Sequence, residues 1–358
     1  MPSLKEIKGR INSISSTLAI TSAMKMVASA KLQKAQMAIQ NMLPYERRLY
    51  SMLLDLMGAM NISAAASEDG SVRGSGSAER GFDQSGDRLS LSNRHDLAGM
   101  DGAYSLMAQR EVRKVAIVAF ASNSSLCGAF NSNVIREATA VINEYRASGL
   151  GDADITVYSV GRKMAEAMKK LGFPSPADFT KMSDSPSYDA ASALAQELFD
   201  GFVSGRFDKV ELVYNHYKST SSQPTTRQTY LPLSLADATA DIQVGKITDS
   251  ASESDTNRGA EPVGAPVVRQ GSPTTEDLIV EPSKEALIAT LLPKVIRLRI
   301  FTTLLDSAAA EHAARTVAMQ LATDNGNDLL QELTLEYNKG RQQKITSEIL
   351  DLVGGSMQ

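Results

Sequence analysis

Apolar side chains recur at alternating intervals of three and four residues at the start of the chain. The positions are Leu4, Ile7, Ile11, Ile14 and Leu18. This spacing is typical of a heptad seam, the stripe along which two α-helices pack in a coiled coil. It predicts one helix over residues 3–60, with a small-residue face continuing through Val27 and its neighbouring alanines. At about 1.5 Å per residue such a helix is roughly 80 Å long, which indicates a rod rather than a helix inside a compact domain.

Two features modify the ends of this predicted helix. Ser3 can cap its N-terminus, with Glu6 three residues later as the second half of a capping box. Pro44 lacks a backbone N–H and is expected to kink or interrupt the helix near its far end.

A second long helical pattern occupies the C-terminal segment, residues 279–358. Small residues form a stripe in its first half: Ala308, Ala309, Ala310, Ala313, Ala314, Val317 and Leu321. Apolar residues extend the seam towards the C-terminus: Leu330, Leu333, Tyr337, Ile345, Ile349 and Leu352. Two rods with a shared period are expected to pair with each other. Because a whole domain connects them, we expect the pairing to be antiparallel.

Strand and helix patterns alternate in the middle of the chain. Buried strands are predicted at VRKVAIVAFAS, ADITVYSVG and FDKVELVYNHYKS, with helices between them and a further strand at TTRQTYLPL. This alternation predicts an α/β fold with a mostly parallel, Rossmann-like sheet over residues 108–233. The N-terminal coiled-coil helix then covers residues 1–61. The segments 62–107 and 234–278 are rich in Ser, Gly and Asp and are predicted to be flexible insertions.

Composition narrows the functional classes. The 358 residues include 15 Met and no Trp, and only 5% are aromatic, which favours long helices with adaptable contact faces over an aromatic-lined ligand pocket. The net charge of −4 argues against nucleic acid as a partner. The single cysteine excludes an internal disulfide and a multi-cysteine zinc site.

The loop SNSSLCGAFN, which follows the first predicted strand, is the candidate for ligand chemistry. It has one glycine, Gly128, and neither a Walker lysine nor a GxGxxG pattern. A helix N-terminus there can still attract an anion, so an α/β nucleotide- or phosphate-binding enzyme with a coiled-coil arm stays open as the alternative. Cys127 has no activating neighbour in sequence and is expected to be a buried thiol.

No metal or cofactor is expected. His312 follows Glu311, but Thr316 stands where a second ligand on the same helix face would be, so an ordinary helix-surface pair is expected.

Polar residues on the two rods have two interpretations. The N-terminal helix carries six cations with few acids between them: Lys5, Lys8, Arg10, Lys25, Lys31 and Lys34. Periodicity alone favours a solvated coiled-coil face, and the alternative is a face presented to acidic partners. On the last helix, Arg341, Gln342 and Thr346 share one side and suit a hydrogen-bonded contact with a partner.

Two long motifs carry a family resemblance. LKEIKGRINSISSTLAITSAMKMVASAKLQKAQ closely resembles the N-terminal signature of the gamma subunit of F-type ATP synthases. EHAARTVAMQLATDNGNDLLQELTLEYNKGRQQKITSEILDLVGGS resembles that family's C-terminal signature, and SNSSLCGAFNSNV resembles the start of its α/β domain. The family's common SDRGLCG pattern lacks its acid and its arginine in this chain.

The resemblance implies a role as the central rotor shaft. In this family the terminal helices form an antiparallel coiled coil inside a ring of alpha and beta subunits, and the α/β domain forms the foot, with the epsilon subunit, on the membrane c-ring. Ion-driven rotation of the ring and shaft then forces the catalytic sites of the alpha/beta hexamer through their conformational cycle. The resemblance therefore implies a non-catalytic subunit, peripheral on the cytoplasmic side of a bacterial inner membrane and held there only through the complex.

The resemblance also assigns contact residues. Contacts with the beta subunits are implied for Met24, Lys25, Arg341, Gln342 and Thr346. Contacts of the foot with epsilon and the c-ring are implied for the segment NHYKSTSSQP, with Asn215, Lys218, Ser222 and Gln223.

Overall fold

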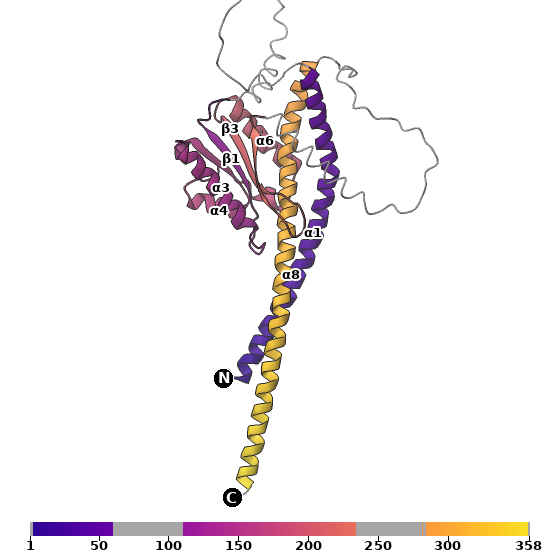
Figure 1. Ribbon diagram of the computed structural model, residues 1–358, viewed down its shortest axis with the longest axis vertical. Helices are drawn as coiled ribbons and strands as arrows, with labels where there is room; N and C mark the ends of the chain where they lie inside the picture. Colours follow the sequence, from indigo (N-terminus) through magenta and orange to yellow (C-terminus); the bar gives the residue numbers. More distant parts are fainter. Residues whose placement is uncertain (1–2, 60–109, 234–280, 282–283, 357–358) are drawn as a thin grey trace, which may run out of the picture.

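A computed structural model of the chain describes residues 3–59, 110–233, 281 and 284–356. Two long helices lie side by side, and an α/β domain packs against the part of this pair that lies away from the two chain termini (Figure 1). The two predicted insertions, 62–107 and 234–278, fall outside the described residues. Within the described part of the chain, no helix combines the length and the apolar character needed to cross a membrane.

The rod consists of α1 (Leu4–Ala59) and α8 (Lys284–Ser356). Leu4 lies against Gly340, and Leu18 lies against Gly326. Further along α1, Glu46 forms an ion pair with Arg299. The partner positions on α8 fall as the positions on α1 rise, so the predicted antiparallel pairing is confirmed.

The rod ends in a single helix because α1 begins opposite Gly340. Beyond that point α8 continues alone, and its side chains from residue 341 to 353 are all exposed. Figure 1 shows this C-terminal end of α8 extending well past the N-terminus. The predicted continuation of the seam through Ile345, Ile349 and Leu352 is therefore wrong: these side chains are exposed, and no helix in the described part of the chain packs against them.

The seam on α1 keeps its strict three-four spacing after Leu18. It passes through Thr21, Lys25, Ala28 and Leu32, which are buried or partly buried. The predicted small-residue face through Val27 is wrong, because Val27 is 58% exposed whereas Ala28 is 2% exposed. Leu321, predicted in the stripe on α8, is likewise exposed. Polar residues such as Thr21 and Lys25 at seam positions interrupt the apolar period in the sequence, although the two helices still pack along the same stripe.

The predicted cap at the start of α1 is present, whereas the predicted interruption at Pro44 is not. The Oγ of Ser3 accepts a hydrogen bond from the backbone N of Glu6 at 3.3 Å, so the predicted cap is present. The Glu6 carboxylate pairs with Arg10. At Pro44 the helix is not interrupted, and α1 continues to Ala59. Side chains on the following turns, such as Leu49, are buried in the core and support the helix there.

The sheet has the strand order β2-β1-β3-β4. Its strands are β1 (Val115–Phe120), β2 (Ile155–Val160), β3 (Lys209–Asn215) and β4 (Thr225–Leu231). β1 pairs in parallel with β2 and β3, and β4 is antiparallel to β3, so the predicted mostly parallel sheet is confirmed. The shorter helical elements are α3 (Phe130–Ala147), η2 (Asp152–Asp154), α4 (Arg162–Lys170), α5 (Thr180–Asp184) and α6 (Tyr188–Val203).

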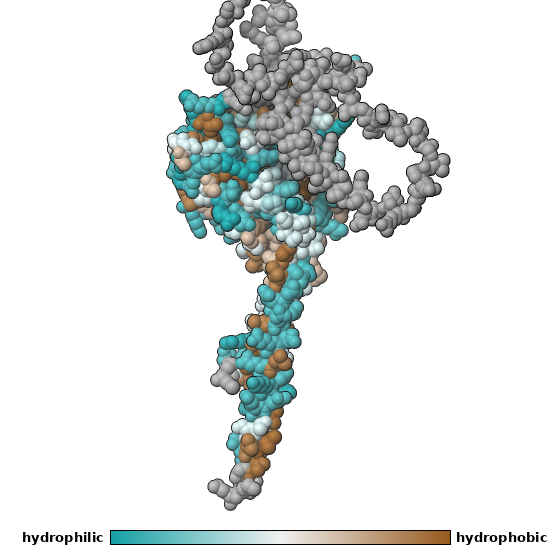
Figure 2. Space-filling model, viewed as in Figure 1, coloured by the Kyte–Doolittle hydropathy of each residue, from teal (hydrophilic) through white to brown (hydrophobic). Residues whose placement is uncertain are grey.

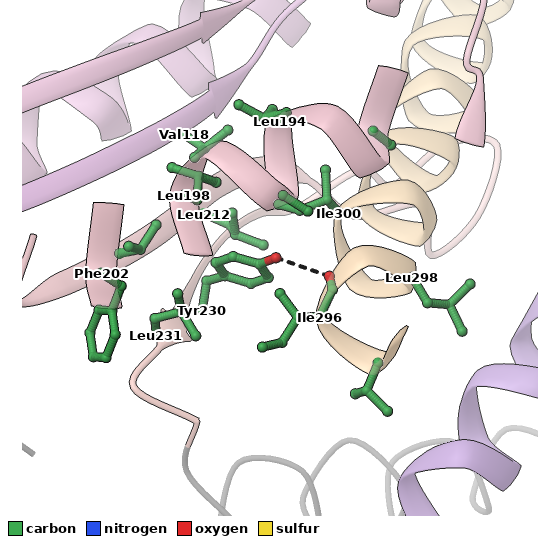
Figure 3. Close-up of a cluster of buried hydrophobic side chains, with 14 of the residues drawn as sticks. Val118, Leu194, Leu198, Phe202, Leu212, Tyr230, Leu231, Ile296, Leu298 and Ile300 are labelled. Atoms are coloured by element: carbon green, nitrogen blue, oxygen red, sulfur yellow. Dashed lines mark hydrogen bonds between the residues drawn. The ribbon is translucent and has the colours of Figure 1, made fainter. Parts of the chain in front are cut away.

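Helices cover both faces of this sheet. α3 and α4 cover one face with side chains such as Val134 and Met164. The other face packs on α6 and on α8, whose Ile296 and Ile300 are fully buried. Figure 3 shows this second cluster, in which the Tyr230 hydroxyl donates to the carbonyl oxygen of Ile296 at 2.9 Å. α8 is therefore part of the domain core as well as half of the rod.

Candidate functional site

The outer surface of the rod alternates between apolar and polar patches (Figure 2). On α1 the large exposed apolar side chains include Ile20, Met24 and Met26. Met24 is 40% exposed, whereas its neighbour Lys25 occupies a seam position and is partly buried. The two residues predicted to contact beta subunits from α1 therefore have different surroundings.

The predicted C-terminal patch lies on the single-helix end of the rod. Arg341, Gln342 and Thr346 are all exposed, and the Thr346 hydroxyl donates to the carbonyl oxygen of Gln342 at 2.9 Å. Thr21 bonds to Thr323 across the seam at 3.1 Å. Met24, one turn further along α1, then lies roughly 32 Å from Arg341 along the axis. The structure thus separates the predicted contacts into two bands along the rod.

The predicted foot residues lie at the turn between β3 and β4. Asn215 is 1% exposed: its Nδ2 donates to the Phe130 carbonyl oxygen at 3.1 Å, and its Oδ1 accepts from Thr225. Lys218 and Ser222 are exposed, and Gln223 is partly buried. Asn215 therefore holds the turn in place, while the other three residues lie on it.

The place where an α/β enzyme would bind its ligand is filled by α8. In open α/β sheets ligands bind beyond the carboxyl ends of the strands. Here the ends of β1 and β2, at Phe120 and Val160, enclose a small cavity together with Ala308 and Glu311 of α8. Phe130, the first residue of α3, is also buried against α8. This geometry gives no support to a nucleotide or phosphate site at the head of α3.

Hydrogen bonds within the SNSSLCG segment and to α8 hold this loop in place. Arg315 of α8 donates to the Oγ of Ser124 at 2.7 Å. Cys127 is 1% exposed and accepts a hydrogen bond from the Nδ2 of Asn131 at 3.2 Å, so the expected buried thiol is confirmed. Across the residues that the structure describes, no group of His, Cys, Asp and Glu is arranged to hold a metal ion.

Comparisons with known proteins decide the family. A family model described as ATP synthase matches residues 3–357. The ATP synthase gamma chain of Phocaeicola vulgatus is 47% identical over 357 residues, covering 100% of each chain, and that of Bacteroides thetaiotaomicron is 46% identical over 358 residues, covering 100% of each. The chain belongs to the gamma-subunit family of F-type ATP synthases. The resemblance drawn from its terminal motifs is confirmed, and with it the role of a non-catalytic rotor subunit in the central stalk.

A solved structure shares the fold. A chain from the Euglena gracilis mitochondrial ATP synthase, in an assembly of OSCP, F1 and c-ring, superposes with a TM-score of 0.52. The two chains are 18% identical, and the match covers 99% of this chain and 93% of the other. At this identity the match bears on the fold alone.

Several polar residues that join the parts of this gamma subunit were missed by sequence reasoning. Glu46 and Arg299 pair across the seam, and Tyr217 and Asp306 join the β3–β4 turn to the rod. Counting in sevens from Leu4 reaches both Lys25 and Glu46, so their seam positions could have been found. Nothing in the sequence pairs Tyr217 with Asp306.

His312 and Glu311 are not the helix-surface pair that was expected. Glu311 is 7% exposed and pairs with Arg315 at 2.7 Å, and burial raises the pKa of its carboxyl group. Burial, and then the charges of Arg315 and Lys31, lower the pKa of His312 to about 4. Within the described part of the chain, the His312 Nδ1 has no hydrogen-bond partner. The surface expectation is wrong because α1 and the α/β domain both cover this turn of α8.

The lowered pKa of His312 makes stability depend on pH. Between its ordinary pKa of 6.5 and about 4, the unfolded chain binds a proton at His312 that the folded chain does not bind. The free energy of unfolding is therefore expected to fall as the pH is lowered from 7 to 5. In His312→Gln this contribution disappears, so urea titrations should show a smaller fall than in the wild type. An equal fall in both chains would contradict this assignment.

Proposed function

We propose that the rod formed by α1 and α8 turns inside the ring of alpha and beta subunits, and that the α/β domain is the foot that meets epsilon and the c-ring. The chain would then lie peripherally on the cytoplasmic side of the inner membrane. One observation carries this proposal: the antiparallel helix pair extends past the domain and ends in an exposed single helix. A paired rod is stiff, and its exposed methionines and polar residues offer adaptable, shallow contacts to a surrounding ring.

The two bands of the rod are proposed to meet the beta subunits at different depths. Met24 would offer an exposed thioether, and Lys25 would reach outwards from the seam along its aliphatic stem. Arg341, Gln342 and Thr346 would form the deeper band on the single helix, where charged and amide groups can make hydrogen bonds to acidic partners.

The β3–β4 turn is proposed as the contact with epsilon on the flank of the foot. Lys218 and Ser222 are exposed there, and Gln223 donates to the Thr220 carbonyl oxygen at 2.6 Å, which keeps the turn compact. Asn215 would act indirectly by holding the turn. The end of the domain nearest the start of α8 is then the side proposed to face the c-ring.

Co-expression tests this function directly. The chain is expected to purify with the alpha and beta subunits of its own organism as a complex that hydrolyses ATP. The isolated chain is expected to show no ATP turnover and no nucleotide binding by calorimetry. Nucleotide binding by the isolated chain, together with failure to purify with alpha and beta, would favour the enzyme alternative.

Met24→Lys is expected to weaken the coupling between ATP hydrolysis and ion pumping while assembly is retained. The new ammonium beside Lys25 would form an ion pair with acidic groups of a beta subunit and favour one rotational position. An exposed pair of up to about 1 kcal/mol corresponds to a change of about fivefold in the relative population of that position. The measurement is the ratio of ion pumping to ATP hydrolysis in reconstituted vesicles.

The control is Met37→Lys, which adds the same charge at another exposed methionine of α1, nearer the α/β domain. It is expected to leave the ratio unchanged. Wild-type coupling in Met24→Lys would refute the predicted contact.

A further inference from the structure

The turn between β3 and β4 is bonded to both helices of the rod. The Nε2 of Gln36 on α1 donates to the Tyr217 hydroxyl oxygen at 2.5 Å. The backbone N of Tyr217 donates to Oδ1 of Asp306 on α8 at 2.9 Å, and the His216 Nδ1 lies 2.6 Å from Oδ2 of the same carboxylate. One dipeptide thus connects the sheet with α1 and with α8.

Apolar packing reinforces these bonds. The side chain of Tyr217 packs against two small clusters, one between α1 and α8 and one between α8 and the start of α3. Their buried members are Leu32, Ala309 and Ala313 in the first, and Cys127, Phe130 and Ala310 in the second. Tyr217 therefore lies where three parts of the molecule meet, and the alanines of α8 leave room for its ring.

The turn is also fixed to its own domain. Asn215, at the end of β3, bonds to the Phe130 carbonyl oxygen and to Thr225 at the start of β4. The backbone N of His216 donates to the Pro224 carbonyl oxygen at 2.9 Å. Any rotation of the sheet must therefore move the His216–Tyr217 pair with it.

The two helices depend on this turn to different degrees. α8 supplies part of the domain core, so it is already joined to the sheet over a broad apolar surface. α1 packs chiefly against α8, and its far end joins the domain core through Leu49, Tyr50 and Leu53. Beside Tyr217, α8 contributes only small side chains such as Ala309 and Ala313 to the described seam, opposite Leu32 of α1, and each alanine buries little area. The bond between Gln36 and Tyr217 joins α1 to the α/β domain directly at this level, more than two helical turns before the core contacts of Leu49.

We propose that the His216–Tyr217 turn, together with Asp306 and Gln36, is a torque coupler that makes the α/β domain, α1 and α8 rotate as one body. This inference rests on the proposed function, in which torque enters through the α/β domain. The four residues are positioning residues: they touch no nucleotide and act through the stiffness of the rod. Removing their bonds is expected to make the joint between foot and shaft softer in torsion.

The test measures that stiffness in the assembled complex. The alpha/beta ring is immobilised, a probe is attached to the α/β domain, and the angular variance of the probe is recorded while the complex waits for ATP. The variants are Gln36→Ala, Tyr217→Phe and Asp306→Asn. Variance is inversely proportional to torsional stiffness, and each variant removes or weakens one of the side-chain ties, so we expect an increase of about twofold in each.

Two comparisons make the result specific. Thr220→Ala changes an exposed residue of the same turn and is expected to match the wild type. The double variant Gln36→Ala/Tyr217→Phe is expected to match the single variants, because both substitutions remove the same bond. Gln36 lies on α1, outside the α/β domain, so Gln36→Ala provides a reading even if a substitution in the domain prevents assembly.

The possible outcomes separate the two proposals. A wild-type chain that does not rotate in the ring would overturn the proposed function and the inference together. A rotating wild type with unchanged variance in the assembled variants would overturn the inference alone. A lower unfolding temperature with unchanged variance would show that the turn has only a structural role.

Discussion

Replacing Gly161 with alanine is expected to prevent the α/β domain from folding stably. Gly161 has a φ of 96°, and a Cβ built there would lie 2.1 Å from the Ala121 carbonyl oxygen. That carbonyl cannot move away easily, because it accepts from the Ser183 hydroxyl at 3.0 Å and the N–H of the same peptide group, at Ser122, donates to Oδ1 of Asn131 at 3.0 Å. The left-handed conformation and the clash together should cost about 3–5 kcal/mol, a large part of a typical domain's stability. Urea denaturation of the full chain measures the loss.

Gly172→Ala separates the two causes. Gly172 also has a positive φ, of 90°, but a Cβ there would meet nothing within 4 Å. Its substitution should cost only the conformational term, about 1–2 kcal/mol. Equal losses in the two variants would show that the contact with Ala121 does not control the effect.

Removing the carboxylate of Glu46 is expected to cause the second large loss of stability. Glu46 is 6% exposed, and its Oε1 accepts from the Arg299 Nη1 at 3.3 Å and from the Thr302 hydroxyl at 3.2 Å. Glu46→Ala removes the anion that balances the partly buried Arg299 guanidinium, and breaking such a pair costs about 3–5 kcal/mol. Hydrogen exchange should then show α1 opening more readily, because the ion pair joins α1 to α8 near the α/β domain.

The double variant Glu46→Met/Arg299→Leu tests whether the pair stabilises the rod or sets its register. Replacing both charges by apolar side chains is expected to recover stability to within about 1 kcal/mol of the wild type. Register is read from a disulfide between Thr21→Cys and Thr323→Cys, whose hydroxyl oxygens lie 3.1 Å apart. A lower crosslink yield in the double variant would assign the pair to register. A double variant as unstable as Glu46→Ala would contradict this account.

Local periodicity was enough to predict the large elements. The spacing from Leu4 to Leu18 predicted α1, and the alternation of strands and helices predicted the mostly parallel sheet. These predictions succeed because each depends on neighbours within a few turns of chain. The prediction through Val27 failed because the polar residues Thr21 and Lys25 occupy seam positions, and a search for apolar residues passes over them.

The exposure of the contact residues could not be predicted from the sequence, because it depends on which residues of distant elements lie opposite each other. Ile345 and Ile349 continue the apolar period of α8, yet they are exposed because α1 begins opposite Gly340. Asn215 looks in the sequence like a surface residue of a turn, but it is buried, and its side chain bonds to Phe130 and Thr225.

By itself, then, the sequence determined the two rods, the mostly parallel sheet and the family, because short-range periodicity and long motifs are properties of contiguous chain. Only the tertiary structure decided where the paired rod becomes a single helix and how Tyr217 joins the α/β domain to both helices. Those features arise from the alignment of residues far apart in the chain, and no local pattern encodes that alignment.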